Sequence, residues 1–326
     1  MRIVLVSGGT SDEAAVSRRS GAAVAAALAE HPHQVPVVRV DPAETPLDTF
    51  EAEPSDVFLN LLHGSFGEDG GIQRIAAERG WCLTGCDEDA ARRTFDKALA
   101  RRCLKDADVP HAAGYVAEPD APLPSEIAYP LVVKPSCSGS SVGLSLVERP
   151  AQWAAAIRLA TANTKPNPQC TEAHAAIVEE YLRGPEWSVT LLGREPLPPI
   201  CVETPHRLFD ATAKYASDSS TFTPIPLDRA DAADLCELAV AAAEACGTRG
   251  LVRVDLRSSS FASPPDRGAV RVLEINTVPG MTERSLSPLA AMAAGMSLGE
   301  LAWWMIDDAR GRPQPIDAGL SATGSS

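Results

Sequence analysis

Residues 272–282 read Val-Leu-Glu-Ile-Asn-Thr-Val-Pro-Gly-Met-Thr, a short apolar strand pattern that ends in a proline and glycine turn. Side chains alternate along a strand, so Glu274 and Asn276 are expected on one face and Leu273 and Ile275 on the other. Carboxylate and amide oxygens are ligands that Mg²⁺ prefers in proteins. The stretch therefore predicts a metal site at the end of a strand.

A second short strand, about twenty residues upstream, carries polar side chains at the same spacing, with Arg253 and Asp255 separated by one valine. If the two strands pair, these residues and Glu274 and Asn276 come together. Mg²⁺ is usually held by one or two carboxylates together with substrate phosphates, so this set predicts nucleotide chemistry. The alternative for either strand alone is a row of polar residues on the water-facing side of a ribbon.

Size and charge restrict the class of protein. The chain has 326 residues, enough for two or three domains with a buried core. Its net charge of -14 argues against nucleic-acid or anionic-membrane binding, which both depend on basic surfaces. No apolar run is long enough to span a bilayer and the start has no signal-peptide pattern. We therefore expect a cytoplasmic protein whose partners are neither nucleic acid nor membrane.

The eight cysteines are scattered and include no C-x-x-C pair. This spacing argues against a zinc site or a disulfide framework. We expect reduced thiols that fill small apolar spaces.

The first ninety or so residues alternate strand and helix patterns. Strands are predicted at residues 2–7, 35–40 and 57–62, with a helix over 12–29, which together indicate a parallel sheet flanked by helices. The first strand ends in a glycine turn just before Glu13. That side chain is either a favourable charge at a helix start or a group that reaches into a ligand cleft at the carboxyl end of the sheet.

The third predicted strand runs into His63 and a glycine-rich segment, with four glycines in residues 64–71. Glycines allow backbone to approach a ligand closely. His63 is accordingly either a structural hydrogen-bonding histidine or part of a functional site.

In the middle of the chain, Lys134 ends an apolar strand pattern and precedes a loop of small residues at 136–143. Such a loop can donate backbone N–H groups to phosphates while the lysine supplies a charge, although a Walker A motif is excluded because the lysine precedes the loop. The alternative is an exposed hairpin. A later strand pattern, residues 176–182, turns acidic at Glu179 and Glu180 and could contact adenine and ribose, or carry plain surface acids.

In their order and spacing these motifs resemble the D-alanine:D-alanine ligases of the ATP-grasp superfamily, over residues 3 to about 305. The matching motifs are Gly8-Gly9-Thr10-Ser11 with Glu13, His63-Gly64 with Gly67-Glu68-Asp69-Gly70, Asp96-Lys97, Lys134-Pro135 with Gly139-Ser140-Ser141-Val142-Gly143, Gly184-Pro185-Glu186, Ala213-Lys214-Tyr215, Arg253-Val254-Asp255, and Glu274-Ile275-Asn276 through Pro279-Gly280-Met281-Thr282 to Ser285-Leu286.

The resemblance implies an α/β protein with α+β lobes, an ATP-grasp fold preceded by a doubly wound parallel-sheet domain. The implied divisions are an N-terminal domain at residues 1–93, a central ATP-grasp lobe at 94–182 and a C-terminal lobe at 183–310. The composition of residues 311–326, rich in Gly, Pro, Ser and Ala, predicts a disordered tail.

The resemblance also implies a reaction. ATP phosphorylates the carboxylate of one D-alanine, the amine of a second D-alanine attacks the acyl phosphate, and the dipeptide serves peptidoglycan precursor synthesis. The implied cofactors are two Mg²⁺ per site, with Mn²⁺ as a substitute, and ATP is a co-substrate. A homodimer is implied by the resemblance only.

Site residues follow from the same resemblance. Those implied for ATP are Lys97, Lys134, Ser140, Ser141, Glu179, Glu180, Leu182 and Glu186. Those implied for the metal ions are Asp255, Glu274 and Asn276. Those implied for the two D-alanines are Glu13, His63, Lys214, Ser285 and Leu286. Those implied for catalysis and closure are Glu13, Ser140, Tyr215, Arg253 and the backbone N–H of Gly280.

Two segments depart from the family's usual pattern. Residues 209–215 form a less aromatic and less acidic loop, and Cys137-Ser138 stand where bulkier charged residues are common. Tyr215 favours dipeptide formation over D-alanyl-D-lactate formation. Two other functions stay open, a ligase for another D-amino acid and a non-catalytic nucleotide-binding regulator on the same fold.

Overall fold

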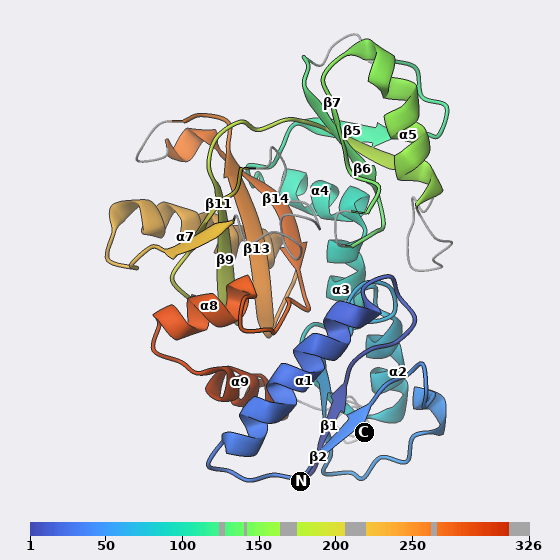
Figure 1. Ribbon diagram of the computed structural model, residues 1–326, viewed down its shortest axis with the longest axis vertical. Helices are drawn as coiled ribbons and strands as arrows, with labels where there is room; N and C mark the ends of the chain where they lie inside the picture. The colour runs from blue at the N-terminus through green and yellow to red at the C-terminus, as the bar shows by residue number, and fades with distance from the viewer. Residues whose placement is uncertain (124–127, 140–141, 164–174, 206–219, 262–265, 313–326) are drawn as a thin grey trace, which may run out of the picture.

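The computed structural model describes the chain except residues 124–127, 140–141, 164–174, 206–219, 262–265 and 313–326. Within the described residues the chain forms three sheets flanked by helices (Figure 1). The helices are α1 (Ala14–Glu30), α2 (Gly71–Arg79), α3 (Glu88–Phe95), α4 (Lys97–Asp106), α5 (Trp153–Ala162), α7 (Ala230–Ala245), α8 (Leu286–Ala293) and α9 (Leu298–Arg310). No single described helix is long and apolar enough to cross a membrane. The pair α8 and α9 reaches the necessary length and apolar composition only when the two helices are counted together, and they are bent by 101° relative to each other.

The N-terminal sheet is parallel and has the strand order β2-β1-β3-β4. Its strands are β1 (Ile3–Val6), β2 (Val37–Val40), β3 (Val57–Asn60) and β4 (Cys82–Leu83). The parallel sheet predicted from the alternating strand and helix patterns is therefore confirmed.

Both faces of this sheet are covered, because successive side chains of a strand point to opposite faces. Ile3 and Leu5 pack in one cluster with residues of α1 and α9, whereas Val4 and Val6 pack in another with residues of α2. The first cluster also takes in Ile200 and Leu251 of the third sheet. The N-terminal sheet and the C-terminal part of the chain thus share one core.

The central sheet is antiparallel and has the order β5-β8-β6-β7. Its strands are β5 (Gly114–Ala117), β6 (Leu131–Pro135), β7 (Ser145–Val147) and β8 (Ala176–Glu180). Helix α5 packs its Trp153 and Ile157 against Leu131 and Val133 of β6. Figure 1 shows this layer at one end of the molecule and the N-terminal sheet at the other.

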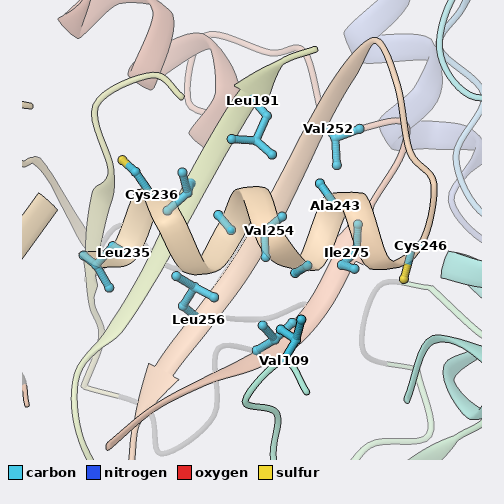
Figure 2. Close-up of a cluster of buried hydrophobic side chains, with 14 of the residues drawn as sticks. Val109, Leu191, Leu235, Cys236, Ala243, Cys246, Val252, Val254, Leu256 and Ile275 are labelled. Carbon is cyan, nitrogen blue, oxygen red and sulfur yellow. The ribbon is translucent and has the colours of Figure 1, made fainter. Parts of the chain in front are cut away.

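The third sheet contains the two strands singled out by the sequence. Its order is β12-β11-β9-β13-β14, with β10 paired to β9. Its strands are β9 (Glu186–Leu192), β10 (Glu195–Pro196), β11 (Ile200–Glu203), β12 (Thr221–Pro224), β13 (Leu251–Ser258) and β14 (Val270–Asn276). Helix α7 covers one face, and Figure 2 shows its Leu235 and Ala243 among Val252, Val254 and Ile275 of the strands.

The predicted pairing of the two polar strands is confirmed. Arg253 lies opposite Asn276 and Asp255 lies opposite Glu274 in the antiparallel pair β13 and β14. The register then shifts by one residue, so that Leu256 lies opposite Val272 and Leu273 has no counterpart on β13. This β-bulge interrupts the alternation.

The bulge overturns one prediction. Leu273 was expected to share a face with Ile275, but only Ile275 lies in the hydrophobic core, while Leu273 lines a pocket together with Glu274. The extra residue turns two successive side chains, rather than alternate ones, toward the pocket.

The prediction for the cysteines is partly wrong. Cys137, at the start of the loop after β6, is disulfide-bonded, and its partner lies outside the described residues. Spacing along the chain carries no signal for a pair that is distant in sequence and lacks a C-x-x-C motif. The free thiols in the described residues include Cys86, Cys236 and Cys246, which lie in the core cluster as expected, and burial raises the pKa of Cys246 to about 12.

Candidate active site

Two neighbouring cavities lie where the three sheets meet. The larger has a volume of about 570 Å³ and the smaller about 110 Å³, and Lys97, Ser138 and Glu274 line both. The predicted site residues that line the larger cavity are Glu13, His63, Lys97, Arg253, Glu274, Asn276, Gly280, Ser285 and Leu286. Those that line the smaller one are Lys97, Lys134, Glu179, Glu180, Leu182, Glu186, Asp255 and Glu274.

Lys97 stands at the boundary between the two cavities. Asp96 is the N-cap of α4 and accepts a hydrogen bond from the backbone N–H of Ala98 at 3.0 Å, which sets Lys97 at the first position of the helix. The Lys97 Nζ donates to the carbonyl oxygen of Ser138 at 2.7 Å and lies 3.1 Å from Glu274 Oε1. One ammonium group thus joins α4, the loop after β6 and the end of β14.

A buried carboxylate between two cations forms the inner wall of the smaller cavity. Glu179 Oε2 lies 2.7 Å from Lys134 Nζ, and Glu179 Oε1 accepts from Arg101 Nη1 at 2.8 Å. Arg101 also donates to the carbonyl of Ala112 at 2.9 Å. Because each carboxylate oxygen has its own cation, the orientation of Glu179 is fixed, and through it the position of the Lys134 ammonium.

Another part of the lining of the smaller cavity is built around a second arginine. Arg257 Nη1 lies 3.2 Å from Glu186 Oε2, and its guanidinium carbon lies 5.1 Å from the centre of the Tyr181 ring. A flat cation over an aromatic face is a stable and well-oriented pair. Glu186 is thereby held on the strand β9 side of the pocket.

Asp255 accepts hydrogen bonds from three side chains of the site. Arg253 binds it with two hydrogen bonds, Nε to Oδ1 at 2.9 Å and Nη2 to Oδ2 at 2.8 Å. Ser188 donates to Oδ1 at 2.8 Å and Asn276 Nδ2 donates to Oδ2 at 3.1 Å. Such a network holds β9, β13 and β14 in one register at their polar ends.

The donor set suits a hard divalent cation. Asp255, Glu274 and Asn276 offer carboxylate and amide oxygens from neighbouring positions on β13 and β14, the ligand type that Mg²⁺ and Mn²⁺ accept. In the part of the chain that the structure describes, no three His, Cys, Asp or Glu side chains are grouped closely enough to form a metal site by themselves. A cation here would therefore depend on the Asn276 amide and on phosphate oxygens of a ligand.

Glu13 reaches into the larger cavity rather than acting only as a charge at a helix start. It is the N-cap residue of α1 and makes no side-chain capping bond. A Cβ atom built at Gly64 would lie 2.7 Å from Glu13 Oε2, and one built at Gly139 would overlap the same oxygen. Glycine at both positions lets the loop after β3 and the loop after β6 approach this carboxylate.

Glu68 also belongs to the site, although the sequence assigned it no role. Its Oε2 accepts from the backbone N–H of Gly64 at 2.6 Å, and it lines the larger cavity. Burial, followed by the negative charge of Glu13, raises the pKa of Glu68 to about 8. Burial and the negative charge of Glu13 therefore both favour the protonated form of Glu68.

His63 is buried at the wall of the larger cavity with both ring nitrogens within hydrogen-bonding distance of protein groups. Nδ1 lies 3.0 Å from the carbonyl oxygen of Val278, and Nε2 lies 3.3 Å from Ser20 Oγ. Burial lowers the pKa of His63 to about 4. The imidazole is accordingly neutral at pH 7.

The turn after β14 brings Gly280 to the start of α8. A Cβ atom at Gly280 would lie 2.9 Å from Ser285 Oγ, so a larger residue there would displace the Ser285 hydroxyl. Ser285 is the N-cap residue of α8 but makes no side-chain cap bond, and instead its Oγ lies 2.8 Å from Thr282 Oγ1. The backbone N–H of Leu286 opens the helix, where unpaired donors and the helix dipole favour an anion.

Four predicted site residues lie outside the described part of the chain. They are Ser140, Ser141, Lys214 and Tyr215. The atypical loop at residues 209–213 lies outside it as well.

Sequence reasoning missed several residues that hold the predicted ones in place. Arg101 contacts Glu179, which is 78 residues away in the chain, and Ser188 contacts Asp255, which is 67 residues away. No local spacing pattern reveals contacts between residues so far apart. Glu68 could have been found from the sequence. It lies among the four glycines of residues 64–71, a segment where the backbone was already expected to approach a ligand closely.

Comparison with known proteins places this arrangement in a family. Residues 115–307 match the family model described as D-ala D-ala ligase C-terminus. The D-alanine--D-alanine ligase of Paramagnetospirillum magneticum is 37% identical over 95% of this chain and 98% of that protein. That of Alcanivorax borkumensis is 36% identical over 95% of each chain.

Solved structures agree in fold. A crystal structure of D-alanine--D-alanine ligase from Bacillus anthracis covers 95% of this chain and 97% of its own, at a TM-score of 0.77 and 23% identity. The same enzyme complexed with ATP matches at a TM-score of 0.75. The predicted ATP-grasp fold with an N-terminal parallel-sheet domain is confirmed. With a family model over more than half of its length and relatives above 30% identity along nearly all of it, the chain belongs to the D-alanine--D-alanine ligase family.

Proposed function

We propose that this protein joins two D-alanines to D-alanyl-D-alanine with ATP, through an acyl phosphate, for peptidoglycan precursor synthesis. One observation carries the proposal. A cavity lined by Lys134, Glu179 and Glu186 adjoins a second cavity lined by Glu13 and Ser285, and Lys97 with Glu274 lines both. A nucleotide in the first and an amino acid in the second would meet at that pair.

The first step needs charge stabilisation around a moving phosphoryl group. Lys97 and Lys134 supply two ammonium groups, and their anionic contacts, Glu274 and Glu179, hold them oriented before the nucleotide arrives. Preorganised cations are effective because they need no reorientation while charge shifts from ATP to the carboxylate. Glu180, Leu182, Ser140 and Ser141 complete the proposed nucleotide site.

Asp255, Glu274 and Asn276 would hold the divalent cations, and we propose two Mg²⁺ per site. When bound, the ions neutralise phosphate charge and align the reacting oxygens. The Arg253 and Ser188 contacts keep Asp255 in place for this role.

In the second step the amine of the other D-alanine attacks the acyl phosphate and phosphate leaves. Arg253 and the backbone N–H of Gly280 would stabilise the oxyanion, which needs donors fixed before charge develops. Ser285 Oγ, the Leu286 N–H and Lys214 would receive the carboxylate of the attacking D-alanine. Glu13 would recognise the first D-alanine, and His63, whose ring nitrogens both contact protein groups, would form part of the wall of that site.

Closure of the site involves all three parts of the chain. We propose that residues 1–93, 94–182 and 183–310 are three domains, of which the first and the third share a core, and that Glu13, Ser140 and Tyr215 connect all three when the site closes. Excluding water protects the acyl phosphate from hydrolysis. The close approach of Glu13 to Gly139, next to Ser140, supports this contact.

Assembly and location complete the proposal. We propose that the protein is cytoplasmic, because its proposed substrates, D-alanine and ATP, are small molecules of the cytoplasm. We also propose that it is a homodimer, as the family resemblance implies. Light scattering on the purified protein tests the assembly, and a mass of one chain at micromolar concentration would refute the dimer.

The test of the activity is phosphate release with Mg-ATP, combined with mass spectrometry of the products. The amino acids compared are D-alanine, L-alanine, D-serine, and D-alanine with D-lactate. We expect release that requires D-alanine and yields the dipeptide. Phosphate release with only another D-amino acid would support the proposed reaction but refute D-alanine as the substrate. No phosphate release with any of these amino acids would refute the ligase activity.

A further inference from the structure

Helix α1 contacts the turn after β14 through one fully buried hydroxyl group. Ser20 Oγ accepts a hydrogen bond from the backbone N–H of Met281 at 3.1 Å, from a position 261 residues earlier in the chain. Ser20 and Met281 have no exposed surface. A buried hydroxyl in such a place must be satisfied by protein groups.

The same hydroxyl lies 3.3 Å from His63 Nε2, while His63 Nδ1 lies 3.0 Å from the carbonyl oxygen of Val278. The direction of each bond follows from the inventory of donors and acceptors. A carbonyl can only accept, so Nδ1 carries the proton. The neutral ring then has no proton on Nε2, so Ser20 donates to it and uses a lone pair for Met281.

Together these bonds hold the turn at two points. His63 fixes the carbonyl of Val278 and Ser20 fixes the N–H of Met281, which leaves Pro279 and Gly280 between two anchors. Gly280 lines the larger cavity. An oxyanion donor is useful only when its N–H is aimed before charge develops.

We propose that Ser20 is a positioning residue for the Gly280 N–H, which it aims by anchoring Met281 and by donating a hydrogen bond to Nε2 of His63. The inference rests on the proposed function, in which that N–H stabilises the oxyanion of the second step. It also gives His63 a role within the protein, because both ring nitrogens contact protein groups.

The competing explanation is that Ser20 only fills space on the buried face of α1. Ser17 offers a matched comparison one turn earlier on the same helix. It is equally buried, and its hydroxyl accepts from Gly8 N and donates to the carbonyl of Leu61, both at 2.7 Å. These bonds join α1 to the segments that follow β1 and β3 and do not reach the turn after β14.

Three variants separate the two explanations. Ser20→Ala removes the hydroxyl, Ser20→Cys keeps the volume but weakens both hydrogen bonds, and Ser17→Ala removes a buried hydroxyl elsewhere on the helix. Thermal unfolding of each variant records the structural cost.

The first readout is the Nε2 signal of His63, by nitrogen NMR of protein labelled at its six histidines, with His63→Gln to assign the signals. We expect the tautomer protonated at Nδ1 in the wild type and in all three variants, because the Val278 carbonyl fixes it. In Ser20→Ala we expect the Nε2 signal to shift, because that nitrogen loses its hydrogen-bond donor, while Ser17→Ala keeps the wild-type signal. An unchanged Nε2 signal in Ser20→Ala would overturn the proposal, and this readout needs no turnover.

The second readout is the ratio of phosphate to dipeptide. With Gly280 misaimed, the acyl phosphate forms but is captured slowly, so we expect Ser20→Ala and Ser20→Cys to lower kcat for dipeptide by about ten-fold to a hundred-fold. The KM for ATP should change by less than about two-fold, since the residues that bind the nucleotide are unchanged in these variants. The phosphate released per dipeptide should rise above that of the wild type.

Two results would overturn the catalytic part. One is full activity in Ser20→Cys, which would mean that volume alone matters. The other is an equal loss in Ser17→Ala. A wild-type protein that makes no dipeptide would instead reject the proposed function, while the Nε2 signal would still decide whether Ser20 donates to His63.

Discussion

The ammonium group of Lys97 lies 3.1 Å from a carboxylate oxygen of Glu274, and this contact joins the first turn of α4 to the C-terminal end of the strand β14. Both residues line the two cavities. In the proposed function Lys97 would contact phosphate and Glu274 would bind metal ions, and in this structure the two side chains form an ion pair. Binding of Mg-ATP would exchange this contact for one with phosphate and one with metal, without moving either backbone.

Glu274→Gln tests the metal role of that carboxylate. The amide keeps the shape but loses the charge, so we expect dipeptide formation to fall by on the order of a thousand-fold, as for loss of several kcal/mol of transition-state stabilisation. The measurement is coupled phosphate release at saturating Mg-ATP. Glu203→Gln, at an exposed position of β11 in the same sheet, is the control. Normal turnover by Glu274→Gln would refute the metal assignment.

Arg253→Lys tests the forked contact to Asp255. A lysine keeps the charge but cannot make two parallel hydrogen bonds, so Asp255 and the oxyanion donor both lose alignment. We expect kcat to fall by about a hundred-fold with a smaller effect on the KM for ATP.

The chain supplies a close control for this change. Arg229 also binds a carboxylate two residues later, Asp231, with bonds of 2.9 and 2.6 Å, but at the surface. Arg229→Lys should leave kcat unchanged. An equal loss of activity in Arg253→Lys and Arg229→Lys would show that replacing either arginine acts through folding and not through the active site.

Arg101→Ala tests whether the second cation of Glu179 matters for ATP. Without Arg101 one carboxylate oxygen of a buried glutamate loses its partner, and Lys134 is drawn toward the remaining negative charge. We expect the KM for ATP to rise by about ten-fold. The neighbouring Arg102, which is exposed, provides the control Arg102→Ala. A KM that stays at the wild-type value would remove Arg101 from the nucleotide site.

Local patterns predicted those parts of the site that lie within one strand or one strand pair. Asp255 and Glu274 face each other because both strands have short polar ends that can pair in only a few registers. The bulge at Leu273 was not predictable, since it adds one residue to a ladder without a distinct sequence signal. The contact of Ser20 with Met281 depends on how the N-terminal sheet docks on the third sheet, and spacing along the chain contains no information about docking.

Glu68 should make stability depend on pH in a defined window. Its pKa is raised from 4.5 to about 8 in the folded protein, so between these values the folded state binds a proton that the unfolded state has released. The contribution is fully present below pH 4.5 and is lost as the pH rises through about 8.

Glu68→Gln removes this titration while keeping an oxygen for the Gly64 N–H. We expect the variant to lose less stability than the wild type between pH 5 and pH 8, measured by urea unfolding at several pH values. His63 has the opposite effect between pH 4 and 6.5, because its pKa is lowered to about 4, but it is present in both proteins and cancels in the difference. Glu78→Gln, at an exposed position of α2, is the control. Parallel stability curves for Glu68→Gln and the wild type would mean that Glu68 is ionised in the folded protein, and that Glu13 and Glu68 face the substrate as two charges.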